Sequence, residues 1–154
     1  MIRTGLGVDT HRFAEGRRLV LGGVEIPHER GLAGHSDADV LAHAVTDAIL
    51  GAAGLGDIGE DFPDTDPRWE GADSLALLRE VVALVARDGW TVAHVDATVM
   101  LERPRLAPFR AEIAARLADA TGGTVSVKAT TGEGMGFVGR EEGAAALAVA
   151  TLER

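Results

Sequence analysis

The pattern of apolar and polar positions predicts strands at the start of this 154-residue chain. Residues 2–9 alternate between apolar or threonine side chains and small or polar ones, which is the period of a strand. A second apolar run over residues 18–26 is interrupted by Gly22-Gly23. Because paired glycines between two apolar runs are typical of a tight turn, this first part of the chain predicts a hairpin.

The period then changes to that of a helix. Apolar side chains recur at helical spacing over residues 40–52, and Gly54 and Gly56 follow them. Ser36 is the predicted N-cap, with Asp37 and Asp39 in the first turn, where acidic groups favour the positive end of the helix dipole. The remaining predicted elements are a helix from Asp73 or Ser74 to Gly89, a strand over 91–101 with its odd-numbered residues from Ala93 to Leu101 on one face, a helix from Pro108 to Gly122, and strands over 124–129 and 144–152.

The order of these elements, ββααβαββ, predicts one α/β (α+β) domain over residues 1–154. It would have a mixed β-sheet with helices on one face. The final strand carries alanine on both faces, at positions 144, 145, 146, 148 and 150. Small side chains on both faces suit close packing against another surface, and a neighbouring subunit is one candidate for it.

Composition and charge exclude several classes of function. The chain has no cysteine, which excludes disulfides, thiolate metal sites and cysteine nucleophiles. Its formal net charge is −9 and Lys128 is its only lysine, so we expect no nucleic-acid partner. It has no apolar run long enough to cross a membrane and no signal-like segment after Met1. These features predict a soluble, cytoplasmic protein.

Three side chains form a candidate metal site. Asp9 and His11 are two residues apart on a predicted strand and therefore share a face. His43 lies on the first helix, which could bring it to that strand. One aspartate, two histidines and an open position are a donor set used by catalytic zinc. The alternative is that each histidine is half-buried and paired with a nearby carboxylate, and for an isolated Asp-x-His pair this alternative is favoured.

Two loops carry further candidate chemistry. Residues 57–73 contain seven acidic side chains stiffened by Phe62, Pro63 and Pro67, and such carboxylates could bind sugar-type hydroxyls or Mg²⁺, although a solvated acidic loop is the simpler reading. Residues 128–140 alternate glycine with Thr130, Thr131 and other residues, a pattern whose backbone N–H groups can bind an anion. Glu133 in this loop is a candidate metal ligand, while the alternative is a plain hairpin turn. The residues alone therefore indicate metal-assisted chemistry on a phosphorylated, hydroxylated small molecule.

Four segments resemble the 2-C-methyl-D-erythritol 2,4-cyclodiphosphate synthases of non-mevalonate isoprenoid biosynthesis. They are GVDTHRF (7–13), the run from GHSDADV to PDTDP (34–67), GADS (71–74) and KATTGEGMGFVGREEG (128–143). The resemblance spans essentially the whole chain. It implies a phosphorus–oxygen lyase that converts 4-diphosphocytidyl-2-C-methyl-D-erythritol 2-phosphate to the cyclic diphosphate and CMP, through attack of the substrate's own 2-phosphate on its β-phosphorus.

The resemblance also implies roles for individual residues. Asp9, His11 and His43 correspond to zinc ligands, and Glu133 to a ligand of Mg²⁺ or Mn²⁺. His35 and Thr131 correspond to the residues that stabilise the transition state. The implied substrate-binding residues are Asp9, Thr10, His11, His35, Ser36, Asp57, Ile58, Gly59, Phe62, Pro63, Asp64, Thr65, Asp66, Leu101, Glu102, Arg103, Pro104, Arg105, Leu106, Ala107, Thr130, Thr131, Gly132, Glu133, Phe137 and Arg140, with 101–107 as the cytidine loop.

The same resemblance implies a homotrimer whose active sites lie between subunits. Phe137 and Arg140 correspond to residues that line a cavity on the threefold axis, where an isoprenoid diphosphate binds in family members. Two alternative functions use only part of this set of residues. One is a zinc-dependent phosphoesterase acting on a phosphorylated sugar alcohol, and the other is a trimeric module that only binds isoprenoid diphosphates.

Overall fold

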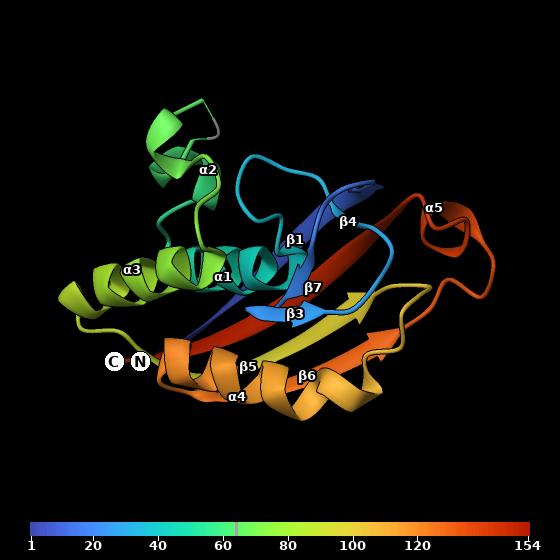
Figure 1. Ribbon diagram of the computed structural model, residues 1–154. Coiled ribbons are helices and arrows are strands. Elements are labelled where there is room, and N and C mark those ends of the chain that lie inside the picture. The colour runs from blue at the N-terminus through green and yellow to red at the C-terminus, as the bar shows by residue number, and fades with distance from the viewer. Residues whose placement is uncertain (64) are drawn as a thin grey trace.

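A mixed five-stranded sheet forms the centre of the molecule (Figure 1). The structure is a computed structural model, and it describes residues 1–63 and 65–154. The strand order is β4-β1-β7-β5-β6, in which β5 and β6 are parallel and the other neighbours are antiparallel. The strands are β1 (Ile2–Ala14), β4 (Gly31–Leu32), β5 (Thr91–Met100), β6 (Thr124–Thr130) and β7 (Gly143–Glu153).

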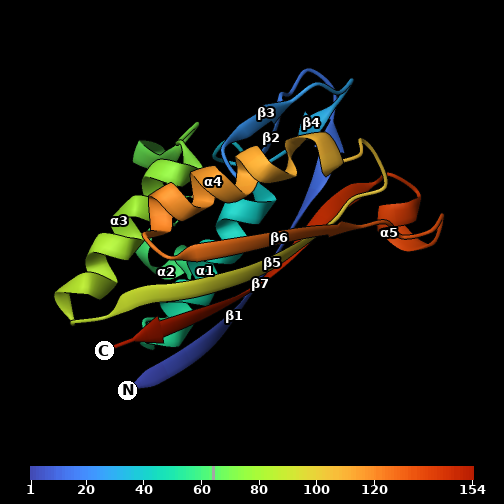
Figure 2. The same cartoon turned by 90° about the horizontal axis from the view of Figure 1, so that it is seen from below.

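The three long helices cover one face of this sheet, as predicted (Figures 1 and 2). They are α1 (Val40–Ala53), α3 (Ser74–Arg87) and α4 (Arg110–Thr121). Shorter elements that the sequence pattern did not predict are α2 (Ile58–Asp61), α5 (Gly136–Gly139) and the 3₁₀ turns η1 (Pro67–Trp69) and η2 (Ala107–Phe109). None of the helices in the described part of the chain is long and apolar enough to span a membrane.

The predicted hairpin between the first strand and residues 18–26 is wrong. The second run folds on itself, because β2 (Leu19–Leu21) pairs with β3 (Val24–Ile26) across the Gly22-Gly23 turn. Both glycines have positive φ, 58° and 76°, which the tight turn requires. The partner of β1 is instead β7, from the other end of the chain, in register from Ile2–Glu153 to Arg12–Gly143.

Two local predictions are corrected by backbone geometry. Ala38 has φ 55°, outside helical space, so α1 cannot include it and Asp39 rather than Ser36 is the N-cap. The Asp39 side chain accepts the backbone N–H of Ala42 at 2.9 Å. In β5, a register shift between Val92 and His94 turns Val92 into the core in place of the predicted Ala93.

Helix α1 packs very closely on β1 because glycine leaves room for it. A Cβ atom at Gly7 would lie 1.8 Å from the carbonyl oxygen of Ala44, and one at Gly5 would lie 2.1 Å from that of Ala48. The β7 residues opposite these glycines are alanines, at positions 148 and 150. Most alanines of β7 are therefore buried under α1 within the same chain. The suggestion that they pack against a neighbouring subunit is corrected accordingly.

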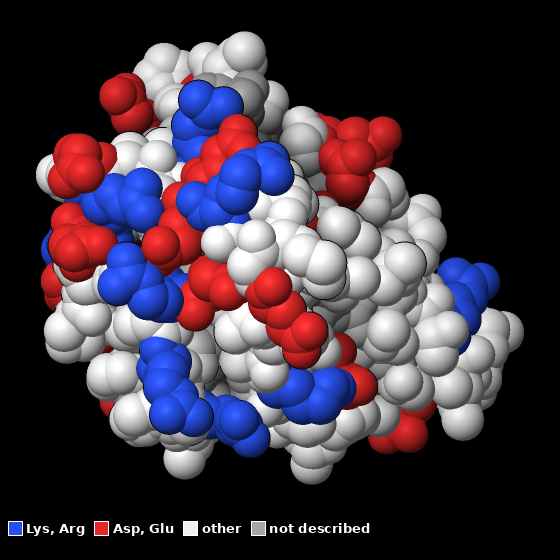
Figure 3. Space-filling model, turned by 90° about the vertical axis from the view of Figure 1, so that its right-hand side faces the viewer, with Lys and Arg blue, Asp and Glu red and all other residues white. Residues whose placement is uncertain are grey.

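The uncovered face of the sheet carries larger apolar side chains. Leu6 pairs with Val149 and Val8 pairs with Leu147 across β1 and β7. These four side chains are 38–63% exposed, which is unusual for a contiguous group of this size. The face shown in Figure 3 is charged instead. Acidic and basic side chains are interspersed on it, and no continuous basic surface is visible.

Candidate active site

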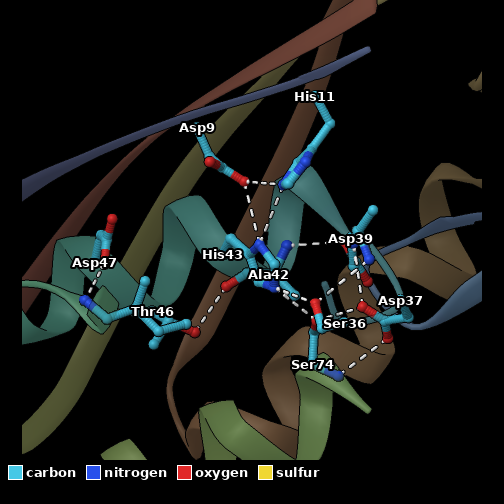
Figure 4. Close-up of polar contacts among 12 residues, drawn as sticks. Asp9, His11, Ser36, Asp37, Asp39, Ala42, His43, Thr46, Asp47 and Ser74 are labelled. Carbon is cyan, nitrogen blue, oxygen red and sulfur yellow. Dashed lines mark hydrogen bonds and ion pairs between the residues drawn. The ribbon is translucent and has the colours of Figure 1, made fainter. Parts of the chain in front are cut away.

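Strand β1 and helix α1 bring Asp9, His11 and His43 together (Figure 4). Asp9 Oδ2 lies 2.9 Å from His11 Nε2 and 3.2 Å from His43 Nδ1, and the two ring nitrogens are 3.4 Å apart. Alternation along β1 places the first two side chains on the face covered by α1. The close approach at Gly7 then sets the helix near enough for His43 to complete the group.

The three atoms form a triangle suited to a divalent metal ion. In a tetrahedral site with bonds of about 2.0–2.2 Å, neighbouring ligand atoms lie about 3.3–3.6 Å apart. The observed separations of 2.9–3.4 Å are within a few tenths of an ångström of this range. Within residues 1–63 and 65–154, this is the group of three His or acidic side chains whose ligand atoms converge in this way.

The second nitrogen of each ring is also held. His11 Nδ1 lies 2.9 Å from the carbonyl oxygen of Ala33, which can only accept a hydrogen bond. His43 Nε2 lies 2.8 Å from Ser74 Oγ and 3.1 Å from Ser36 Oγ. Such outer contacts fix the orientation of metal-binding histidines in other proteins.

The electrostatics of the group favour an ionised aspartate. Burial alone raises the pKa of Asp9, but hydrogen bonds from His11 and His43 and the charge of their protonated rings lower it to about 2. Burial lowers the pKa of His43, yet the hydrogen bond to Asp9 and the nearby carboxylates raise it above its ordinary value. Without a metal, Asp9 therefore favours a proton on the His43 ring, and a bound cation has to displace it.

A pocket of about 440 Å³ opens beside this centre. Its lining combines side chains from β1 and α1 with residues from α2 and η1. The full lining is His11, Gly34, His35, Ser36, His43, Ile58, Gly59, Phe62, Pro63, Trp69 and Leu77. Of the predicted erythritol-binding residues, Ile58, Gly59, Phe62 and Pro63 therefore line the same pocket as His11 and His43.

Carboxylates of α1 and of the acidic loop itself hold this loop in place. Asp47, one turn beyond His43 on α1, accepts the backbone N–H of Ile58 at 2.7 Å. Burial raises the pKa of Asp47. Asp57 caps α2 through Oδ1, which accepts N–H groups of that helix. Asp66 forms an ion pair with Arg68 at 2.6 Å, Thr65 is exposed, and Asp64 lies outside the described residues.

Most of the remaining predicted residues line other pockets of the same chain. Thr131, Gly132, Glu133 and Phe137 line a pocket of about 420 Å³. Leu101, Glu102, Pro104, Arg105, Leu106, Ala107, Thr130 and Thr131 line one of about 200 Å³, and Thr10 and Phe137 line a third with His11. Arg103 pairs with Glu141, and Arg140 with Glu142. A single chain thus does not gather Thr131 and Glu133 into the pocket of the three ligands.

Glu102 connects two of these predicted segments. Its carboxylate accepts the backbone N–H groups of Gly132 at 2.8 Å and Gly134 at 3.1 Å. Two backbone N–H groups of the glycine-rich loop therefore already donate to a carboxylate of the 101–107 loop. Glu133, between these glycines, is exposed and has φ 51°.

Sequence reasoning did not assign several residues of the site. Asp37 and Ser74 contact each other beside His43, and Trp69 and Leu77 line the pocket. Asp47 carries a usable signal, since it follows His43 by one helical turn on the same face. Ser74 meets His43 only because α3 packs beside α1, which local spacing does not reveal.

One aspartate and two histidines beside a pocket in a mixed α/β domain define a candidate metal-dependent enzyme. The model of the YgbB family matches residues 2–153, and the chain belongs to this family. The chain is 60% identical over 155 residues to the 2-C-methyl-D-erythritol 2,4-cyclodiphosphate synthase of Salinibacter ruber, covering 99% of each chain.

Some relatives are longer, bifunctional proteins, and this chain matches only part of them. The chain is 65% identical to a bifunctional enzyme IspD/IspF of Anaeromyxobacter dehalogenans, and it spans 40% of that protein. A solved 2C-methyl-D-erythritol-2,4-cyclodiphosphate synthase in a CDP-bound form superposes with a TM-score of 0.90 at 40% identity, over 98% of this chain and 100% of that one. The bifunctional IspDF of Campylobacter jejuni superposes with a TM-score of 0.95 at 46% identity, over 42% of its length.

Proposed function

We propose that this protein is a 2-C-methyl-D-erythritol 2,4-cyclodiphosphate synthase. Its substrate would be 4-diphosphocytidyl-2-C-methyl-D-erythritol 2-phosphate, and its products the cyclic diphosphate and CMP. An oxygen of the 2-phosphate attacks the β-phosphorus, and the bond from that phosphorus to the α-phosphate oxygen breaks. The observation that carries the proposal is the Asp9–His11–His43 triangle beside a pocket, in a chain similar over its whole length to such a synthase.

The donor set supports zinc as the ion held by Asp9, His11 and His43, since two imidazoles and one carboxylate leave a fourth position open. A zinc ion there, with Mg²⁺ or Mn²⁺ at Glu133, would supply positive charge to the phosphate oxygens. The chain needs no side-chain nucleophile for this reaction, because the attacking group belongs to the substrate. Its part is to position the two phosphates and to neutralise their charge.

The pocket residues suit a phosphorylated polyol. His35 lies within 3.2 Å of the Asp66 carbonyl through Nε2, which orients its ring at the pocket wall. We assign His35 and Ser36 to contacts with phosphate oxygens. Asp57 uses Oδ1 for its cap, and within the described residues no hydrogen bond uses Oδ2, which we assign to a hydroxyl of the erythritol. Phe62 and Trp69, in edge-to-face contact, give the pocket an apolar wall.

We further propose a homotrimer in which one chain supplies the metal-binding pocket and its neighbour the cytidine-binding loop. Two observations support a shared site: Thr131 and Glu133 line a different pocket from His43 within one chain, and Leu6, Val8, Leu147 and Val149 leave an apolar face uncovered. Mixing a His43→Ala chain with a Thr131→Ala chain under subunit exchange should restore activity. No recovery despite proven exchange would argue against the shared site.

Phe137 and Arg140 are the basis for proposing a binding site for a second ligand. Phe137 is 41% exposed on α5, and the Arg140 guanidinium lies 3.7 Å from Glu142 at the protein surface. In the proposed trimer we assign these two residues to an isoprenoid diphosphate, with the ring against its chain and the guanidinium on its phosphates. Calorimetry with farnesyl diphosphate should show binding that Arg140→Ala weakens. Equal binding by both proteins would contradict the assignment.

Product analysis tests the proposed reaction. Purified protein is incubated with the substrate, Zn²⁺ and Mg²⁺, and the products are followed by ³¹P NMR and by CMP detection. The proposal predicts equimolar CMP and cyclic diphosphate. Inorganic phosphate with no cyclic product would instead identify a phosphoesterase, and no turnover with diphosphate binding would identify a binding module.

A further inference from the structure

We propose that Asp37 and Ser74 are positioning residues that fix the tautomer of His43 and so prepare it to bind metal. The inference rests on the proposed function only in taking Asp9, His11 and His43 as a metal centre. Neither Asp37 nor Ser74 touches the three ligand atoms of that centre directly. Their contacts run through the far side of the His43 ring (Figure 4).

The metal centre demands one tautomer of His43. A neutral imidazole has one N–H and one lone pair, and a metal ligand needs the lone pair. The nitrogen that faces Asp9 and His11 is Nδ1. The proton of a neutral, metal-ready His43 must therefore be on Nε2, which requires a hydrogen-bond acceptor next to Nε2.

A serine hydroxyl does not by itself supply this direction, because it can donate as well as accept. Ser74 Oγ lies 2.8 Å from His43 Nε2. If its hydroxyl donated to Nε2, the ring proton would move to Nδ1 and occupy the position that the metal needs. The arrangement around Ser74 has to exclude that direction.

Asp37 excludes it. The Ser74 hydroxyl donates to Asp37 Oδ1, and an ionised carboxylate can only accept. With its proton engaged there, Ser74 Oγ can only accept from His43. The resulting chain, His43 Nε2–H to Ser74 Oγ–H to Asp37, has a single direction and leaves a lone pair on Nδ1.

Local structure holds this chain of hydrogen bonds rigidly. Ser74 is the first residue of α3, where its backbone N–H has no helical partner, and Asp37 Oδ2 accepts that N–H at 3.0 Å. Asp37 Oδ1 also accepts the N–H of Asp39, the N-cap of α1, at 3.1 Å. Ser74 is 1% exposed, so bulk water does not replace its hydroxyl. Asp37 thus connects the starts of both helices to the metal centre.

The tautomers of His11 and His43 are set by different kinds of hydrogen-bond partner. The partner of His11 Nδ1 is a backbone carbonyl, whose direction is fixed by its chemistry. The partners of His43 Nε2 are the hydroxyls of Ser74 and Ser36, whose direction depends on what they contact. Removing the Asp37 charge should therefore affect His43 specifically.

The isosteric variant Asp37→Asn gives the sharpest test. Its amide nitrogen can donate to Ser74 Oγ, which lets the hydroxyl donate to His43 and favours the wrong tautomer. We expect zinc affinity, measured with the zinc ion alone by competition with a chelator, to fall about 10–100-fold. Ser74→Ala should also weaken zinc binding, but no more than Asp37→Asn, since Ser36 remains 3.1 Å from Nε2. Ser126→Ala, the same change on the exposed surface of β6, should leave zinc affinity unchanged.

The double variant separates this role from general stabilisation. With Ser74 already Ala, Asp37→Asn should have little further effect on zinc affinity, because the Ser74 hydroxyl through which Asp37 acts on His43 is gone. In zinc-loaded wild-type protein, the His43 Nε2 proton should give an exchange-protected NMR signal that exchanges faster in both single variants. Wild-type zinc affinity in folded Asp37→Asn, or fully additive losses in the double variant, would overturn the proposal. If this pattern holds while no CMP forms, only the proposed reaction is wrong.

Discussion

A methyl group at Gly7 should separate the proposed metal ligands without touching any of them. Gly7 lies on β1 two residues before Asp9, and α1 crosses it next to His43. In Gly7→Ala the new Cβ would start 1.8 Å from the carbonyl oxygen of Ala44 and 2.7 Å from the nitrogen of Ala48. Both are backbone atoms of α1, so no side-chain rotation relieves the clash.

The size of the effect follows from these distances. To reach an ordinary contact of about 3 Å or more, helix and strand have to separate by more than about 1 Å. Zinc sites tolerate deviations of only about 0.2 Å in ligand distance, so His43 and Asp9 can no longer bind one ion without strain. We expect zinc affinity to fall at least about 10-fold, kcat/KM about 100-fold, and stability by about 1–3 kcal/mol.

Gly51→Ala is the matched control. Gly51 lies on the same helix and also faces β1, but a Cβ there would be 3.8 Å from its nearest neighbour, the carbonyl oxygen of Leu6. This variant should keep zinc affinity and activity, and gain up to about 1 kcal/mol because alanine favours a helix. Zinc affinity is measured by chelator competition and stability by urea unfolding of the metal-free protein. Wild-type zinc affinity in folded Gly7→Ala would show that the close packing of α1 on β1 does not position the three side chains.

Four further outcomes are expected. His43→Ala should lose stoichiometric zinc and at least about 10³-fold in kcat/KM while its far-ultraviolet spectrum is kept. Glu133→Gln should lose the dependence of activity on Mg²⁺ or Mn²⁺ in a metal titration but keep zinc. Asp39→Ala should unfold about 3 kcal/mol more easily in urea, since three backbone N–H groups, those of Gly22 and Gly23 among them, lose a charged acceptor. Zinc affinity should fall from about pH 8 to about pH 6, because the raised pKa of His43 lets protons compete; a flat profile would contradict this.

Periodicity predicted the elements that carry the site but not how they meet. Alternation along residues 2–9 identified a strand, and the two-residue spacing of Asp9 and His11 placed both on one face of it. The helical repeat after residue 40 identified the element that carries His43. Whether that helix lies on that face depends on Gly5 and Gly7, which local pattern reads only as weak points in a strand.

The wrong sequence predictions arise where the structure depends on backbone conformation or on contacts between distant parts of the chain. Ser36, Asp37 and Asp39 are all good cap residues, and only the left-handed backbone of Ala38 decides among them. The pairing of β1 with β7 joins the two ends of the chain, so no turn sequence between the two strands predicts it. The contact of Ser74 with His43 depends on the packing of two helices, and the separation of Glu133 from the pocket depends on the whole sheet.

Anomalous X-ray diffraction at the zinc edge, from crystals grown with Zn²⁺, tests the metal centre most directly. We expect one strong peak bonded at about 2.0–2.2 Å to Asp9 Oδ2, His11 Nε2 and His43 Nδ1, with a fourth position facing the pocket. Binding of His43 through Nε2, or a zinc peak away from these three residues in crystals of the folded protein, would contradict it.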